Sequence, residues 1–166
     1  MTLEGTQGKK VVLDEVEVAL FPYTYRLGYH LIKEYQSTLL FRSGCGATGP
    51  CIYTLVDKST GKKVQKFTQL ICIDTDARLA NSRPYAYNFV VYFSENYDSL
   101  NVYFIDTKKS LQTSFDIRNN KVTSVIPEHQ FISMSKTDNV VTLTYKNDDN
   151  ISTKLKINVA NAKYHR

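Results

Sequence analysis

The sequence lacks any long apolar run. No segment approaches the roughly 18 consecutive apolar residues that a transmembrane helix needs, and residues 1–10 (MTLEGTQGKK) lack the apolar core of a secretory signal. Of the 166 residues, 42% are hydrophobic and 22% charged, which is typical of a globular chain. The composition therefore argues against a membrane-spanning protein and against a disordered one.

Residues that usually carry catalysis are also scarce. The chain has three histidines, His30, His129 and His165, and no tryptophan. The histidines are not accompanied by a serine elbow, an H-E-x-x-H motif or a Cys-His signature, and no G-x-x-x-x-G-K-[ST] phosphate loop occurs. We therefore predict no catalytic residues, no cofactor and no metal site. A hydrolase that uses His30 or His129 is kept as a minor alternative.

Concentrated positive charge is absent as well. The net charge is +5, but the basic residues are spread over both halves of the chain. The densest group, Lys58, Lys62, Lys63 and Lys66, brackets a turn sequence and is typical of a solvated hairpin tip. We expect no nucleic-acid partner, and membrane contact only through a lipid anchor outside this sequence.

Helical periodicity is rare, whereas alternation of β-branched and aromatic residues with polar ones is common. Short turn sequences rich in Asn, Asp, Ser, Lys and Gly separate these segments. The pattern predicts an all-β protein, an antiparallel meander of hairpins. The expected strands cover residues 52–57, 62–68, 88–94, 100–106, 111–117, 121–126, 130–135, 139–146 and 151–159.

A meander of this size protects its edges by closing into a barrel or by folding into two packed sheets, so we expect a single barrel-like or sandwich domain. The domain should cover residues 11–160, between a flexible polar leader (1–10) and a C-terminal tail (161–166). The leader fits either a mature chain whose native signal was replaced by Met or a native cytosolic start. At most one short helix is expected, in residues 21–38 or 75–87.

The stretch SGCGATGPC, residues 43–51, contains a literal G-x-G-x-x-G between Cys45 and Cys51. A dinucleotide site would need a helix after the last glycine, but a β-branched and aromatic run follows. We predict a disulfide between Cys45 and Cys51 that rigidifies this loop. Cys72 lies in an apolar run and could be a buried thiol or a competing partner. The C-x₅-C spacing does not match a zinc knuckle.

Two loops are the best candidates for recognition, residues 43–51 and 75–87, because long loops on a β scaffold often bind. The predicted binding residues are Arg42, Thr48, Arg78, Arg83, Tyr85 and Tyr87. We expect a non-enzymatic binding module of the bacterial envelope or secreted space, periplasmic or at the cell surface, that recognises a protein or a glycan. A β-barrel carrier of a small hydrophobic ligand is the main alternative.

Overall fold

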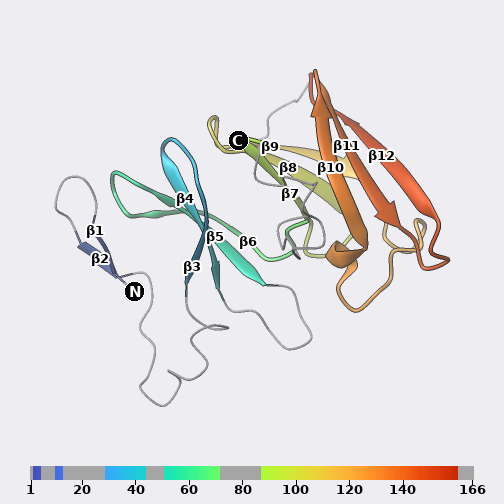
Figure 1. The fold of residues 1–166 in the computed structure, drawn as a ribbon, viewed down its shortest axis with the longest axis horizontal. Helices are drawn as coiled ribbons and strands as arrows, with labels where there is room; N and C mark the ends of the chain where they lie inside the picture. The colour runs from blue at the N-terminus through green and yellow to red at the C-terminus, as the bar shows by residue number, and fades with distance from the viewer. Residues whose placement is uncertain (1, 5–9, 13–28, 44–50, 72–86, 161–166) are drawn as a thin grey trace, which may run out of the picture. The chain divides into compact units, whose positions relative to one another are not determined.

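The computed structural model describes residues 2–4, 10–12, 29–43, 51–71 and 87–160 (Figure 1). The chain divides into two compact units, Met1–Thr68 and Gln69–Arg166, each of which is described by itself. The single domain predicted for residues 11–160 stays a prediction. Among the described residues, no helix has the length and apolar character needed to cross a membrane.

The first unit is built from antiparallel sheets whose strands pair with their neighbours in sequence. A two-stranded sheet pairs β1 (Thr2–Glu4) with β2 (Lys10–Val12). A four-stranded sheet has the order β3 (His30–Glu34), β4 (Thr38–Ser43), β5 (Ile52–Asp57) and β6 (Lys63–Phe67). In the four-stranded sheet, Leu40 and Leu55 are opposite each other in the two central strands, and both are fully buried.

The β5–β6 turn is the hairpin tip predicted from the sequence, and its conformation is fixed by Asp57. One carboxylate oxygen of Asp57 accepts hydrogen bonds from the backbone N–H and hydroxyl groups of both Ser59 and Thr60. These bonds, led by that from the Ser59 hydroxyl, lower the pKa of Asp57 to about 2. Gly61 adopts a positive φ of 67°, which glycine does at no steric cost.

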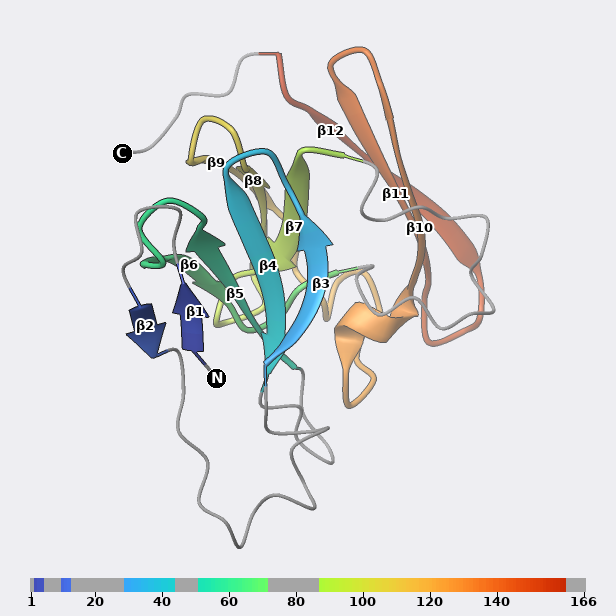
Figure 2. The ribbon, with the colours of Figure 1, turned by 60° about the vertical axis from the view of Figure 1, so that its left-hand side comes forward.

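The second unit contains two three-stranded meanders, visible in green to red in Figures 1 and 2. The first meander has the order β7 (Phe89–Phe93), β8 (Ser99–Phe104) and β9 (Lys109–Ser114). The second has the order β10 (Phe131–Thr137), β11 (Val140–Lys146) and β12 (Ser152–Asn158). A short 3-10 helix, η3 (Pro127–Gln130), leads directly into β10.

One hydrophobic core joins these two meanders. Inward-facing residues of β7 and β8 pack with Met134, Val141, Leu143 and Ile157 of the other sheet. Aromatic rings fill its centre: Phe131 lies 5.6 Å from Phe93, measured between ring centroids. The second unit is therefore two packed sheets around a filled core.

The all-β prediction is confirmed, and most expected strands form within a few residues of their predicted limits. The described strands close into no barrel, whereas the second unit has the sandwich arrangement. The one short helix of the described residues is η3, outside both segments that were expected to hold one.

The strand predicted at residues 121–126 is wrong. This segment forms turns and bends, and two of its N–H groups bond to side chains instead of to a neighbouring strand. The N–H of Thr123 donates to Asp148 Oδ1 at 3.1 Å, and the N–H of Ser124 donates to Gln130 Oε1 at 3.1 Å. Lys121 also has a left-handed φ of 52°, which breaks an extended conformation.

Candidate functional site

The predicted binding loops lie largely outside the described residues. Four of the predicted binding residues also lie outside the described residues: Thr48, Arg78, Arg83 and Tyr85. Arg42 is half-buried in β4, where its neighbours across the sheet are His30 and Tyr53. The roles of these five residues in binding stay predictions.

Tyr87 lies two residues before β7 and has structural contacts. Its ring stacks on that of Phe89, with the centroids 5.2 Å apart. Its hydroxyl oxygen accepts a hydrogen bond of 3.2 Å from the backbone N–H of Lys136 in β10. These contacts link the two sheets of the second unit, so Tyr87 has a structural role, and its role in recognition stays a prediction.

Cys51 lies next to the start of β5. The other two cysteines, Cys45 and Cys72, lie outside the described residues. The specific bridge between Cys45 and Cys51 therefore stays a prediction.

The β10–β12 sheet has one face in the core and one face outside it. Met134, Leu143 and Leu155 are opposite one another in the three strands and face the core, so the alternate residues face away from it. We call this outer surface the hydroxyl–lysine face. It consists of Ser133, Ser135, Thr137, Val140, Thr142, Thr144, Lys146, Ser152, Lys154, Lys156 and Asn158.

The strand register places these residues in rows across the sheet. Thr144 lies between Ser133 and Lys154, so that one row reads serine, threonine, lysine. The next row repeats that order with Ser135, Thr142 and Lys156. Successive residues on one face of a strand are about 7 Å apart. Two copies of the same donor pattern are therefore held side by side on a rigid sheet.

No carboxylate belongs to the hydroxyl–lysine face. The nearest acidic residues in sequence are Asp138, in the β10–β11 turn, and Asp148 and Asp149, in the β11–β12 turn. Asp149 pairs with Lys121, its Oδ2 lying 2.7 Å from Nζ. Lys154 and Lys156 are exposed on the edge strand β12. The face therefore has positive charge along one side and hydroxyl groups across the rest.

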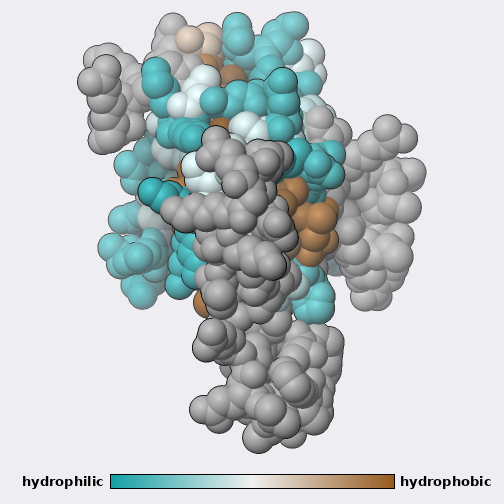
Figure 3. All heavy atoms as spheres, turned by 90° about the vertical axis from the view of Figure 1, so that its left-hand side faces the viewer, coloured by the Kyte–Doolittle hydropathy of each residue, from teal (hydrophilic) through white to brown (hydrophobic). Residues whose placement is uncertain are grey.

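Exposed hydrophobic residues are few and scattered. The large hydrophobic side chains that are exposed in the described part of the chain are Leu31, Val125 and Ile151. Figure 3 shows one face of the molecule, on which the described surface is mostly hydrophilic with small hydrophobic areas. Such scattered residues are normal for a protein surface and do not by themselves indicate a docking site.

A buried polar pair, Tyr97 and Glu128, lies elsewhere in the second unit. Glu128, in η3, is only 4% exposed, and its Oε1 accepts a hydrogen bond of 3.2 Å from the Tyr97 hydroxyl. Its other oxygen, Oε2, is buried and has no hydrogen-bond partner. Tyr97 has a left-handed φ of 57° in the β7–β8 turn, and its ring contacts Phe93.

Burial dominates the protonation of this pair. It raises the pKa of Glu128 above its ordinary value of 4.5, although the bonds from its own N–H and from Tyr97 oppose the shift. Burial, reinforced by the charge of Glu128, also raises the pKa of Tyr97 to about 12. A buried carboxyl with a shifted pKa can be catalytic, but structural groups show the same shift. The hydrogen bond joins η3 to the β7–β8 turn, which is a structural role.

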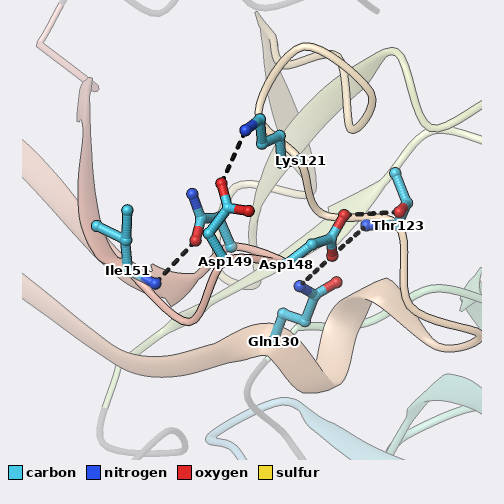
Figure 4. A network of polar contacts seen from close by, with 7 residues as sticks. Lys121, Thr123, Gln130, Asp148, Asp149 and Ile151 are labelled. Carbon is cyan, nitrogen blue, oxygen red and sulfur yellow. Dashed lines mark hydrogen bonds and ion pairs between the residues drawn. The ribbon is translucent and has the colours of Figure 1, made fainter.

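A second polar network fastens residues 121–130 to the β11–β12 turn (Figure 4). Asp148 accepts hydrogen bonds from the N–H and hydroxyl groups of Thr123 and from Nε2 of Gln130, at 3.1, 2.7 and 3.0 Å. The bonds from Thr123 lower the pKa of Asp148. The network is exposed and fully paired, so it too is structural.

We expect Asp148→Asn to destabilise the protein at neutral pH, because an amide cannot accept all of these bonds. The pKa of Asp148 is lowered in the folded state, so its contribution is present above the ordinary value of 3.8 and is lost as the pH falls through the folded value. The difference in urea midpoint between wild type and variant should therefore shrink on acidification. Asp138→Asn, in the exposed β10–β11 turn, is the control. A gap that stays constant with pH would contradict this interpretation.

The hydroxyl–lysine face was not predicted from the sequence, although part of its signal is visible there. Alternating polar residues occur in SMSKT (133–137), TLTYK (142–146) and STKLK (152–156). Each segment overlaps a predicted strand, but a row across three strands depends on register, which these segments do not specify. The Tyr97–Glu128 pair is 31 residues apart in sequence and had no signal at all.

Comparison with known proteins finds no matching family model, no matching curated protein and no matching solved structure. Among the described residues, His, Cys, Asp and Glu side chains form no group of three that could hold a metal ion. A function can therefore be inferred only from the chemistry of this chain's own residues.

Proposed function

We propose that the protein is a non-enzymatic binding module that recognises a macromolecule. The observation that carries the proposal is the hydroxyl–lysine face, an exposed polar surface of repeated composition on the outside of a packed sandwich. Such a surface has hydrogen-bond donors and acceptors at fixed spacing, and its rigid support keeps the entropic cost of binding low. A protein or a glycan is the expected partner, and no nucleic acid.

The filled core supports this proposal over a carrier of a small hydrophobic ligand. A carrier needs an internal lumen, whereas the centre of the second unit is occupied by closely packed rings. Phe115, for example, lies within 5.9 Å of Phe93 and within 5.5 Å of Tyr145, measured between centroids. The predicted loops, residues 43–51 and 75–87, remain proposed as further contacts.

We also propose an oxidising location: periplasm, cell surface or secreted space. The support is the disulfide that the sequence predicts between Cys45 and Cys51, because such bonds persist mainly outside the cytosol. Intact mass after thiol alkylation, with and without reduction, tests this on protein exported to such a compartment. Three alkylated cysteines without reduction would contradict it.

The binding proposal is tested by measuring retention of the purified protein on immobilised neutral glycans, acidic glycans and purified secreted proteins. We expect specific retention by one ligand class with a dissociation constant of about 1–100 μM, typical of a single binding surface. No retention by any class would contradict the proposal. A co-purified lipid in the native mass spectrum would favour the carrier, and cleavage of a bound glycan would favour a hydrolase.

A further inference from the structure

The hydroxyl–lysine face differs in composition from a typical protein–protein interface. Such interfaces are enriched in aromatic residues, Met and Arg, and depleted in Lys and Ser. The face has none of the enriched types; its one apolar residue, Val140, is half-buried. The composition therefore disfavours a protein partner and favours a ligand bound by hydrogen bonds and charge.

The positive charge of the face lies along one edge of the sheet. Lys154 and Lys156 are both exposed on β12, and Lys146 is exposed at the end of β11. The central threonines, Thr142 and Thr144, are half-buried, so their hydroxyl groups lie close to the sheet surface. A ligand that matches this arrangement has negative groups on one side and hydroxyl groups on the other.

We propose that the hydroxyl–lysine face binds an acidic polysaccharide. Its carboxylate or sulfate groups would pair with Lys154 and Lys156, and its sugar hydroxyl groups would hydrogen-bond to the serines and threonines of the same rows. Lysine binds an anion as a flexible point charge, which suits a polymer whose charged groups vary in orientation. The net charge of +5 favours approach of any polyanion. This inference rests on the proposed binding function and names its ligand class.

Lysines on an edge strand have another established use, which is to prevent pairing between sheet edges. That use accounts for Lys154 and Lys156 alone. Protection of the edge does not account for the hydroxyl groups on β10 and β11. In each Ser–Thr–Lys row, a threonine of β11 lies next to the lysine and a serine of β10 lies next to the threonine. A test must therefore separate the contribution of charge from that of the hydroxyl groups.

The experiment measures binding of the full chain to polygalacturonate, which is carboxylated, and to dextran sulfate, with neutral dextran and polyglutamate for comparison. The charge variant is Lys154→Gln/Lys156→Gln. Its matched control is Lys62→Gln/Lys66→Gln, which removes the same charge from exposed residues of the first unit. The hydroxyl variant is Ser135→Ala/Thr142→Ala. Circular dichroism confirms that each variant is folded.

We expect the charge variant to lose about tenfold or more in affinity for an acidic polysaccharide, and the control to change by about twofold or less. The hydroxyl variant should lose about threefold in affinity for the acidic polysaccharide, and its affinity for polyglutamate should change little. Binding should also weaken when the ionic strength is raised from about 0.05 to about 0.3 M.

Three results would overturn the inference. Equal losses in the charge variant and its control would show that only net charge matters. Binding of polyglutamate as tight as that of the polysaccharides would indicate an acidic protein instead. Absence of binding to both acidic polysaccharides would reject the ligand class. If another glycan or protein still binds, and the lysine substitutions have no effect on it, the proposed function stands while this inference fails.

Discussion

Phe93→Ala is expected to reduce the free energy of unfolding of the second unit by about 3–5 kcal/mol, the usual cost of removing a large buried aromatic side chain. Phe93 is 1% exposed and contacts the rings of Tyr97, Phe115 and Phe131. Its truncation would leave a cavity that rings from both sheets cannot fill without moving. Urea denaturation followed by far-UV circular dichroism measures the loss.

Val125→Ala is the control for Phe93→Ala, because Val125 is 80% exposed and its truncation should change stability by about 0.5 kcal/mol or less. Phe93→Leu should recover part of the loss by refilling the cavity. Amide hydrogen exchange in β7 and β10 locates the effect in the second unit. A loss for Phe93→Ala no larger than that for Val125→Ala would mean that the rings do not form a single core.

Tyr97→Phe is expected to cost about 1–3 kcal/mol at neutral pH, because it removes the hydroxyl that donates to the buried carboxylate of Glu128. It should also make stability depend more strongly on pH. The pKa of Glu128 is already raised by burial, and the bond from Tyr97 opposes that rise, so its loss raises the pKa further.

The sign of this pH dependence follows from the proton balance. A carboxyl whose folded pKa lies above the ordinary 4.5 binds more protons in the folded than in the unfolded state. Its contribution to stability is therefore complete below pH 4.5 and is lost as the pH rises through the folded value. The side chain introduced by Glu128→Gln cannot ionise. The stability of this variant should therefore vary less with pH than that of the wild type.

Urea midpoints measured from about pH 4 to about pH 8 test both variants. The double variant Tyr97→Phe/Glu128→Gln should be as insensitive to pH as Glu128→Gln alone, because the titrating group is gone. If Glu128→Gln retained the pH slope of the wild type, another group would have to be responsible.

The sequence predicted the strands well because their signal is local. Alternation in residues 139–146, for example, reflects one buried and one exposed face, and β11 forms there. The strand prediction failed at residues 121–126. Val122 and Val125 are typical of a strand, but the N–H groups between them donate to the side chains of Asp148 and Gln130. Local composition contains no information about acceptors that distant in sequence.

The candidate site was less predictable than the fold. Arg42 and Tyr87 are predicted to bind because they lie beside or in loops; Arg42 lies near the end of β4 and Tyr87 two residues before β7, and both are half-buried. The hydroxyl–lysine face required the register of three strands, including a bulge between Phe131 and Ser133. One residue of slip would move every hydroxyl to the core side, so no prediction from single strands could have found it.

The Asp148 network has a kinetic consequence. Within each of the two described meanders of the second unit, the strands pair with their neighbours in sequence, so each meander can form early from local contacts. The bonds between Thr123 and Asp148 instead join residues 25 apart. Closing a loop of this length has an entropic cost, and this cost is lower when the hairpin that contains Asp148 has already formed. Residues 121–126 should therefore become ordered only after the β11–β12 hairpin exists, as a late step in folding.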